Sequence, residues 1–185
     1  MDKVTREEAL RHVSALLSYI GEDANRAGLK ETPDRFLRAW ESSWGKGYNE
    51  KVDVHVKLFP NEGYQELICI KDIPFFSHCE HHIAPFFGTA HVLYRPNNSI
   101  LGLSKFSRII DNIARRLQTQ ERLTKEVCSF LFSRIAPKGL GVLFEATHLC
   151  VTSRGAHSIG ARTTTCSTLG DIDYAMISTM IGEAK

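Results

Sequence analysis

The sequence lacks the features that mark several broad classes of protein. No apolar run in its 185 residues approaches the roughly 20 residues that a membrane-spanning helix needs. Neither sign of charge dominates, because 23 lysines and arginines face 21 aspartates and glutamates and the formal net charge is only +2. A protein that binds nucleic acid or a membrane through a broad basic surface carries a larger excess. We therefore expect no nucleic acid and no membrane among its partners, and any anion to be bound locally.

A disulfide framework is absent as well. The cysteines are odd in number and irregularly spaced: Cys69, Cys79, Cys128, Cys150 and Cys166. The first residues include the charged Asp2, Lys3 and Arg6, which does not fit a signal peptide. We expect a cytoplasmic protein with reduced thiols, in which cysteine beside histidine indicates a metal site.

The patterns that are present fit one domain over residues 1–185, with an N-terminal helical part at 1–50 and a second part at 64–185. Thr5 and Glu8 have the spacing of a capping box, and Thr32-Pro33 is typical of a second helix start. Further elements follow from apolar periodicity. They are strands at 65–73, 86–94, 140–151 and from 163, and helices from Ser104, Thr119 and Asp171. Strands in pairs followed by helices in pairs indicate an antiparallel α+β fold.

The densest chemistry lies in the segment 77–82, SHCEHH, which follows the first predicted strand. Cys79 and His82 stand three apart in a turn, close enough to bind one ion. About seventy residues later, His148 and Cys150 stand two apart in a predicted strand, so their side chains should share one face. Thiolate together with imidazole favours Zn²⁺ over Mg²⁺ or Ca²⁺.

The number of possible ligands exceeds the four of a closed structural site. The candidates are Cys79, His78, His81, His82, His148 and Cys150. This surplus favours catalysis, because spare histidines beside a metal can move protons. Spacing alone leaves both a structural and a catalytic site open.

A second cluster begins with Gly102-Leu103-Ser104-Lys105 and includes Arg108. It places two cations in the first turn of a helix, where the macrodipole disfavours them. A bound phosphate would explain them, and a solvated helix face is the alternative. The chain has no Walker-type glycine loop, so a nucleotide would be held in another way. Glu121, in the first turn of the next helix, is on local grounds an ordinary match to the helix dipole.

Together these segments resemble GTP cyclohydrolase I, a family that opens the guanine ring of GTP at the start of pterin synthesis. The likeness covers roughly residues 5–175, and the combination of CEHH, QERLT and H-x-C is very specific. The matching segments are ETPDRFLRAW (31–40), CEHHIAPFFG (79–88), HVLYRP (91–96), GLSKFSR (102–108), RRLQTQERLT (115–124), HLCVTSRG (148–155) and, more weakly, TTTCSTLG (163–170).

The resemblance implies a role for each matching residue near the metal. Cys79, His82 and Cys150 would be the zinc ligands, with one coordination position left for water. His81 and His148 would transfer protons during the reaction.

The resemblance also implies the contacts with substrate. Gln120 and Glu121 would contact the purine, and Ser104 would act at the ribose ring oxygen. Further side chains would bind the ribose-triphosphate end of GTP: Lys105, Arg108, Arg154, Arg35 and Arg38.

The implied reaction is zinc-dependent hydrolysis of GTP at C8, with release of formate and rearrangement to 7,8-dihydroneopterin triphosphate. The implied fold is the tunnelling fold, in which subunits join their antiparallel sheets into a barrel, commonly as a homodecamer with active sites between subunits. Ala161 and the segment 156–158 depart from the usual residues of the family, so the resemblance does not extend to the detail of that loop. Two alternatives stay open. The first is a tunnelling-fold nitrile reductase, which would use NADPH and a cysteine nucleophile and would not need a Cys/His zinc set. The second is a zinc-stabilised protein that binds GTP without turnover.

Overall fold

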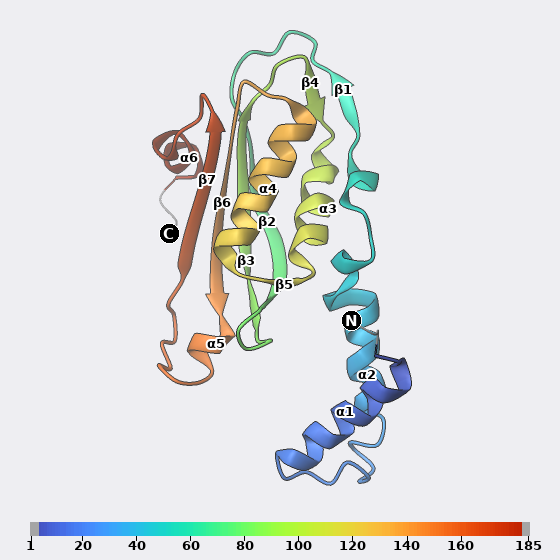
Figure 1. Ribbon diagram of the computed structural model, residues 1–185. Helices are drawn as coiled ribbons and strands as arrows, with labels where there is room; N and C mark the ends of the chain where they lie inside the picture. The colour runs from blue at the N-terminus through green and yellow to red at the C-terminus, as the bar shows by residue number, and fades with distance from the viewer. Residues whose placement is uncertain (1–3, 183–185) are drawn as a thin grey trace. The chain divides into compact units, whose positions relative to one another are not determined.

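The computed structural model describes residues 4–182 (Figure 1). Its contacts divide the chain into two compact units, Met1–Lys46 and Gly47–Lys185. The division of one domain into parts at 1–50 and 64–185 stays a prediction. No helix within residues 4–182 is both long and apolar enough to cross a bilayer.

The N-terminal unit consists of α1 (Arg6–Tyr19), α2 (Thr32–Ala39) and a π-helical turn, η1 (Trp40–Trp44). The predicted capping box is confirmed, because the Thr5 hydroxyl accepts from the backbone N–H of Glu8 and the Glu8 carboxylate accepts from that of Thr5. The second helix starts one residue earlier than predicted, with Glu31 at the N-cap. Thr32 is therefore helical and does not cap the helix.

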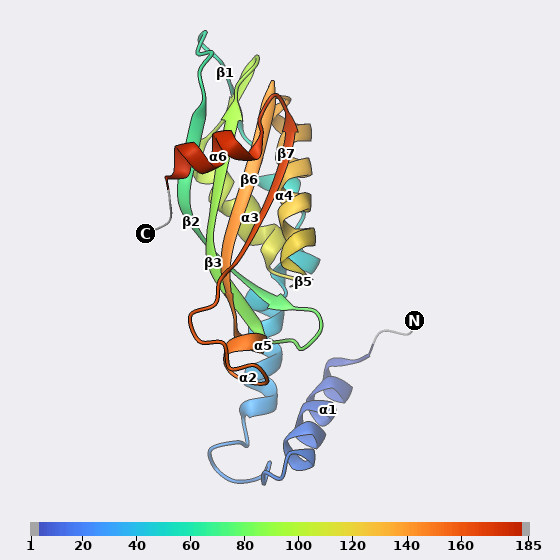
Figure 2. The same ribbon diagram turned by 90° about the vertical axis from the view of Figure 1, so that its left-hand side faces the viewer.

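The second unit contains a main sheet, a small sheet and two layers of helices. Its elements are η2 (Lys46–Tyr48), η3 (Val52–His55), β1 (Leu58–Pro60), β2 (Ile68–Cys79), β3 (Pro85–Arg95), β4 (Ser99–Leu101), α3 (Leu103–Ala114), β5 (Leu117–Gln118), α4 (Gln120–Ile135), β6 (Gly139–His148), α5 (Leu149–Thr152), β7 (Thr163–Gly170) and α6 (Tyr174–Ile181). Figures 1 and 2 show α3 and α4 against one face of the main sheet and α6 across the other.

The main sheet has five strands in the order β5-β2-β3-β6-β7. The four long strands pair antiparallel, which confirms the predicted α+β class with an antiparallel sheet. The two-residue β5 is the exception, since it pairs parallel to the end of β2 and sets Gln118 beside Cys79. β1 and β4 form the separate two-stranded sheet.

The main core lies between the sheet and the helices α3 and α4. Apolar side chains from alternate positions of β2, β3 and β6 fill it, because alternate residues of a strand point to the same face. Phe75 packs edge-on against Phe144 and Phe86, with ring centroids 4.8 and 6.0 Å apart. A rigid aromatic cluster therefore lies beneath the strand ends that carry the candidate site.

Two expectations about element ends were wrong. The strand predicted to run to residue 151 stops at His148, and Cys150 lies in the one-turn helix α5. The reason is that β6 runs out of strands to pair with. His148 pairs with Phe86 near the start of β3, and on the other side the first residue of β7, Thr163, pairs with Ala146, so β7 does not extend as far as His148. The helix predicted from Ser104 begins one residue earlier, at Leu103, with Gly102 at the N-cap and no side-chain cap.

Gly88 marks a close approach between β3 and β6. It pairs with Ala146, and a β-carbon at this glycine would collide with the backbone carbonyl oxygen of Glu145. The two strands can approach this closely only because residue 88 has no side chain.

Candidate metal centre and active site

The three predicted zinc ligands lie together at one end of the sheet. The ligand atoms of Cys79, His82 and Cys150 are all within 4.8 Å of one another. These residues come from segments about seventy positions apart in the sequence, and the pairing of β2 with β3 and of β3 with β6 brings them together. The three donors that the family resemblance implied thus form one cluster, and their binding of zinc stays a prediction.

A tight turn directs His82 back toward Cys79. The backbone N–H of Ile83 donates to the carbonyl oxygen of Cys79 at 2.8 Å, and Ile83 adopts a positive φ of 55°. Nδ1 of His82 lies 3.9 Å from the Cys79 sulfur, and Nδ1 of His81 lies 3.7 Å from it. The turn therefore presents two imidazoles to one thiol.

The helix α5 places the third donor. Beyond His148 the chain leaves the ladder and forms a helical turn, in which Ser153 N–H donates to the Leu149 carbonyl and the Thr152 hydroxyl donates to the His148 carbonyl. This turn brings Cys150 back over Cys79. The predicted shared strand face was wrong, yet the two cysteines still meet.

The chemistry of this donor set fits a soft divalent cation. Burial raises the pKa of the Cys150 thiol and the adjacent Cys79 raises it further, while Arg154 lowers it. Two neighbouring thiolates repel each other in a partly dry site, and a bound cation offsets both the repulsion and the desolvation. Two thiolates and one imidazole match the ligands of Zn²⁺, and three protein donors leave a fourth tetrahedral position open.

A cavity of about 290 Å³ adjoins this cluster. It brings together seven of the residues predicted for the site: Cys79, His81, His82, Gln120, Glu121, His148 and Cys150. Gln118, Thr119 and Val151 also line it and were missed by sequence analysis. The signal for Gln118 was too weak to read, because it depends on a parallel pairing of only two residues.

His148 is held on two sides. Its Nε2 lies 2.7 Å from Oε1 of Gln120, and its ring stacks on Phe86 with centroids 4.6 Å apart and planes 3° from parallel. Burial lowers the pKa of His148, and the carboxylate of Glu121 opposes this shift. His78, one of the six candidate ligands, is buried within β2 and lies outside the three-residue donor cluster.

Three predicted substrate contacts lie away from this cavity within one chain. Ser104, Lys105 and Arg108 belong to the first half of α3, whereas the far end of that helix leads to β5 beside Cys79. A helix of 12 residues is about 18 Å long at 1.5 Å per residue. These side chains do not line the cavity formed by the same chain.

The predicted arginines differ in their surroundings. Arg154 follows α5 and is close enough to Cys150 to lower its thiol pKa. Arg35 and Arg38 belong to the N-terminal unit, where each forms an exposed ion pair one turn back along α2, with Glu31 and Asp34 respectively. Their contact with phosphate stays a prediction.

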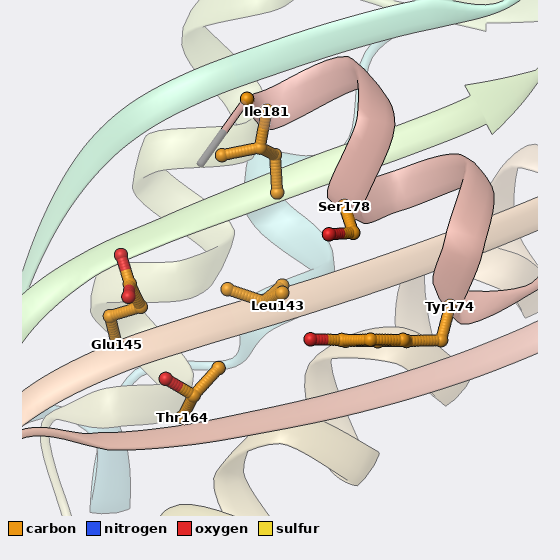
Figure 3. Close-up of a pocket in the computed structure, with 7 residues that line it drawn as sticks. Leu143, Glu145, Thr164, Tyr174, Ser178 and Ile181 are labelled. Atoms are coloured by element: carbon orange, nitrogen blue, oxygen red, sulfur yellow. The ribbon is translucent and has the colours of Figure 1, made fainter. Parts of the chain in front are cut away.

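A second hollow, of about 160 Å³, lies on the opposite face of the sheet under α6 (Figure 3). The side chains of Glu145, Thr164, Tyr174 and Ser178 turn their oxygens toward it, and Leu143 lies at its floor. On the same strand system, His91 accepts from the backbone N–H of Asp72, and its buried Nε2 has no hydrogen-bond partner among residues 4–182. None of the residues that line this hollow also lines the 290 Å³ cavity beside Cys79, His82 and Cys150.

The family model and the curated relatives that match this sequence carry the same family name. The family model for GTP cyclohydrolase I matches residues 9–181. The chain is 45% identical over 159 residues to GTP cyclohydrolase 1 of Janthinobacterium sp. (strain Marseille), covering 85% of this chain and 80% of that protein. It is 44% identical over 174 residues to GTP cyclohydrolase 1 of Nitrosospira multiformis, covering 93% and 91%. A crystal structure of the archaeosine synthase QueF-like in the apo form aligns with 58% of this chain and 96% of its own, at 17% identity and a TM-score of 0.46.

Proposed function

The chain belongs to the GTP cyclohydrolase I family of hydrolases, and we propose that it is a zinc-dependent enzyme that hydrolyses the guanine ring of GTP at C8. The products are formate and 7,8-dihydroneopterin triphosphate, the entry to pterin and tetrahydrofolate-type synthesis. Two hydrolytic steps release C8, and the later condensation of the rearranged sugar returns one water. The net reaction therefore consumes one water per GTP.

One observation carries the proposal: a Cys-His-Cys donor set shares a cavity with two further histidines and a carboxylate. Zn²⁺ bound by Cys79, His82 and Cys150 would supply a nucleophile at neutral pH by lowering the pKa of water toward ~7. His81 and His148 can then transfer protons, and Glu121 can bind the guanine base. This combination is what ring hydrolysis requires and what a purely structural metal site would not need.

The two histidines divide the proton transfers. Opening the imidazole ring of guanine places electrons on N7, so an acid must protonate that nitrogen. His148 has this role in our proposal, because it lies two residues from Cys150 and lines the cavity without belonging to the donor cluster. His81, next to His82, transfers protons near the ribose.

The recognition of GTP uses both ends of the molecule. Glu121 binds the N1–H and 2-amino groups of guanine, two adjacent donors that match two carboxylate oxygens. Ser104 acts at the ribose ring oxygen. The ribose-triphosphate end is bound by cationic side chains: Lys105, Arg108, Arg154, Arg35 and Arg38.

The distance from α3 to the cavity supports an active site shared between subunits. Ser104, Lys105 and Arg108 are remote from their own cavity, so they would serve the cavity of a neighbouring copy. In the described part of the main sheet, β7 is an edge strand and β2 is covered on its outer side only by the two-residue β5. Joining such edges between copies would satisfy their backbone groups and close a barrel of the tunnelling type. We propose a ring-forming homo-oligomer, and the number ten comes from the family resemblance.

Incubation of the zinc-loaded protein with GTP tests the reaction. Formate release and the fluorescence of oxidised neopterin phosphates should rise together, in equal amounts. Binding of GTP without formate would instead identify a zinc-stabilised binding protein. Oxidation of NADPH with a nitrile substrate, without formate from GTP, would identify a reductase.

A further inference from the structure

Gln120 makes a set of hydrogen bonds that the proposed reaction leaves unexplained. It is the first residue of α4 and is only 2% exposed. Its amide nitrogen lies 3.2 Å from the Phe144 carbonyl oxygen and 2.9 Å from the Thr163 carbonyl oxygen, with the Thr165 hydroxyl 3.1 Å away. Carbonyl oxygens only accept hydrogen bonds, so the amide nitrogen must face them and the amide cannot be turned over.

This orientation directs the amide oxygen at His148. Oε1 of Gln120 lies 2.7 Å from Nε2 of the imidazole. An amide oxygen only accepts, so Nε2 must carry a hydrogen. That conclusion holds for the neutral ring and for the protonated ring alike, since Nε2 is an N–H in both.

The stacking on Phe86 fixes the ring in the remaining direction. With centroids 4.6 Å apart and planes 3° from parallel, the Phe86 ring sets the plane of the imidazole, and Gln120 sets its rotation within that plane. Nδ1 has no hydrogen-bond partner among residues 4–182. One nitrogen of His148 is thus committed to the protein and the other is left for a ligand.

We propose that Gln120 is a positioning residue, which keeps Nε2–H of His148 bound to the protein so that His148 meets the substrate through Nδ1. The inference rests on the proposed function insofar as it takes His148 to act on GTP. It also revises the role that the family resemblance implied, because the side-chain amide of Gln120 is used within the protein rather than on the purine.

The first test measures the hydrogen on each ring nitrogen directly. Nitrogen-15 magic-angle-spinning NMR of sedimented, zinc-loaded protein labelled at histidine distinguishes the two neutral tautomers at pH 8.5. The spectrum of His148→Ala assigns the signal. We expect the parent protein to show a protonated Nε2 and an unprotonated Nδ1 at His148 before any GTP is added. The opposite tautomer would overturn the inference.

The second test compares three variants of buried side chains. Gln120→Leu removes the acceptor for Nε2–H, whereas Gln120→Glu keeps an acceptor there and loses the amide donor toward the strands. Asn112→Leu is the matched control, because Asn112 is also a buried amide, with one bond to the Glu50 carbonyl, and lies on α3 away from His148. All three should lose some thermal stability.

Only Gln120→Leu should also change His148. We expect a mixture of tautomers and a fall in kcat of about tenfold or more, with zinc content unchanged and KM for GTP altered by less than about threefold. Gln120→Glu should restore the parent tautomer and part of kcat. An equal loss of kcat in Gln120→Leu and Asn112→Leu would overturn the inference by reducing Gln120 to a stabilising residue.

The two proposals fail in different ways. A zinc-loaded parent that releases no formate from GTP would refute the proposed function, while the tautomer, measured without substrate, would still decide the placement of His148. If neither Gln120 variant folds, the parent spectrum alone decides it.

Discussion

Replacement of Glu121 by glutamine should remove the preference of the protein for guanine. Glu121 lies in the first turn of α4 and lines the same cavity as Cys79 and His148. The exchange keeps the size of the side chain and turns one acceptor oxygen into an amide donor, which then faces an N–H of the base. GTP should lose at least one charge-assisted hydrogen bond, whereas ATP has neither an N1–H nor a 2-amino group to lose.

The expected loss of GTP affinity follows from the number of hydrogen bonds that the exchange removes. A hydrogen bond to a charged group contributes about 1.5–3 kcal/mol, so the loss of one should weaken GTP binding by about 10- to 150-fold. Glu121 is solvent-exposed in the single chain, which favours the lower end of this range. ITP retains N1–H but lacks the amino group and should bind the parent with intermediate affinity. Binding of ATP should hardly change, so the GTP/ATP discrimination should fall by the same factor as GTP affinity.

Calorimetric titration of GTP, ITP and ATP into zinc-loaded protein measures these affinities. A His148→Asn background should slow turnover during the titration by about 10²-fold. Glu121→Asp is the informative control, because it keeps the negative charge at the start of α4 but shortens its reach. If Glu121 only complements the helix dipole, its loss should lower the free energy of unfolding by about 0.3–1 kcal/mol and leave discrimination intact. In that case Glu121→Asp would behave like the parent in every titration, and guanine recognition by Glu121 would be refuted.

Four further outcomes are expected. Cys150→Ser should lose most of its zinc by metal analysis, and full retention would exclude Cys150 as a ligand. His148→Ala should keep its zinc and bind GTP but turn over about 10²-fold more slowly, whereas parallel loss of zinc would make His148 a ligand. Removal of zinc in air should let Cys79 and Cys150 form a disulfide, which mass spectrometry detects; two free thiols would contradict it. Burial lowers the pKa of His91; the charges of Asp72 and Glu145 oppose this shift, and Lys71 adds a smaller lowering. As the pH falls, the imidazole therefore binds a proton more readily in the unfolded chain than in the folded chain, which destabilises the fold. The urea midpoint should therefore fall as the pH drops through about 6.5, and less steeply in His91→Phe; identical slopes would show that His91 does not contribute.

The parts of the fold that sequence predicted well are those set by local patterns. The capping box at Thr5 and Glu8 depends on residues three positions apart, and it forms as expected. The paired strands and helices followed from apolar periodicity, and their antiparallel arrangement followed from the order of elements.

The parts that sequence could not predict depend on distant partners. Alternation of side chains suggested a strand through Cys150, but a strand continues only where a neighbour pairs with it, and both neighbours of β6 have ended by His148. The hydrogen bonds of Gln120 reach residues 24 to 45 positions away, on β6 and β7. A glutamine at a helix start gives no sign of such partners. The purine contact that the family resemblance implies at this position stays a prediction, whereas the bond between the Gln120 side chain and His148 could be found only from the structure.

The close approach at Gly88 bears on how this sequence can change. Phe86, on which His148 stacks, lies two residues along the same strand, and both residues pair across to β6. Any side chain at position 88 would collide with the backbone of β6, and the stacked pair Phe86 and His148 is the pair two residues further along the same two strands. A substitution at position 88 should therefore lower activity, although Gly88 does not line the cavity beside Cys79. A mutant library restricted to residues lining the cavity would overlook it, and a homologue with a larger residue there would need a compensating shift in the spacing of the two strands.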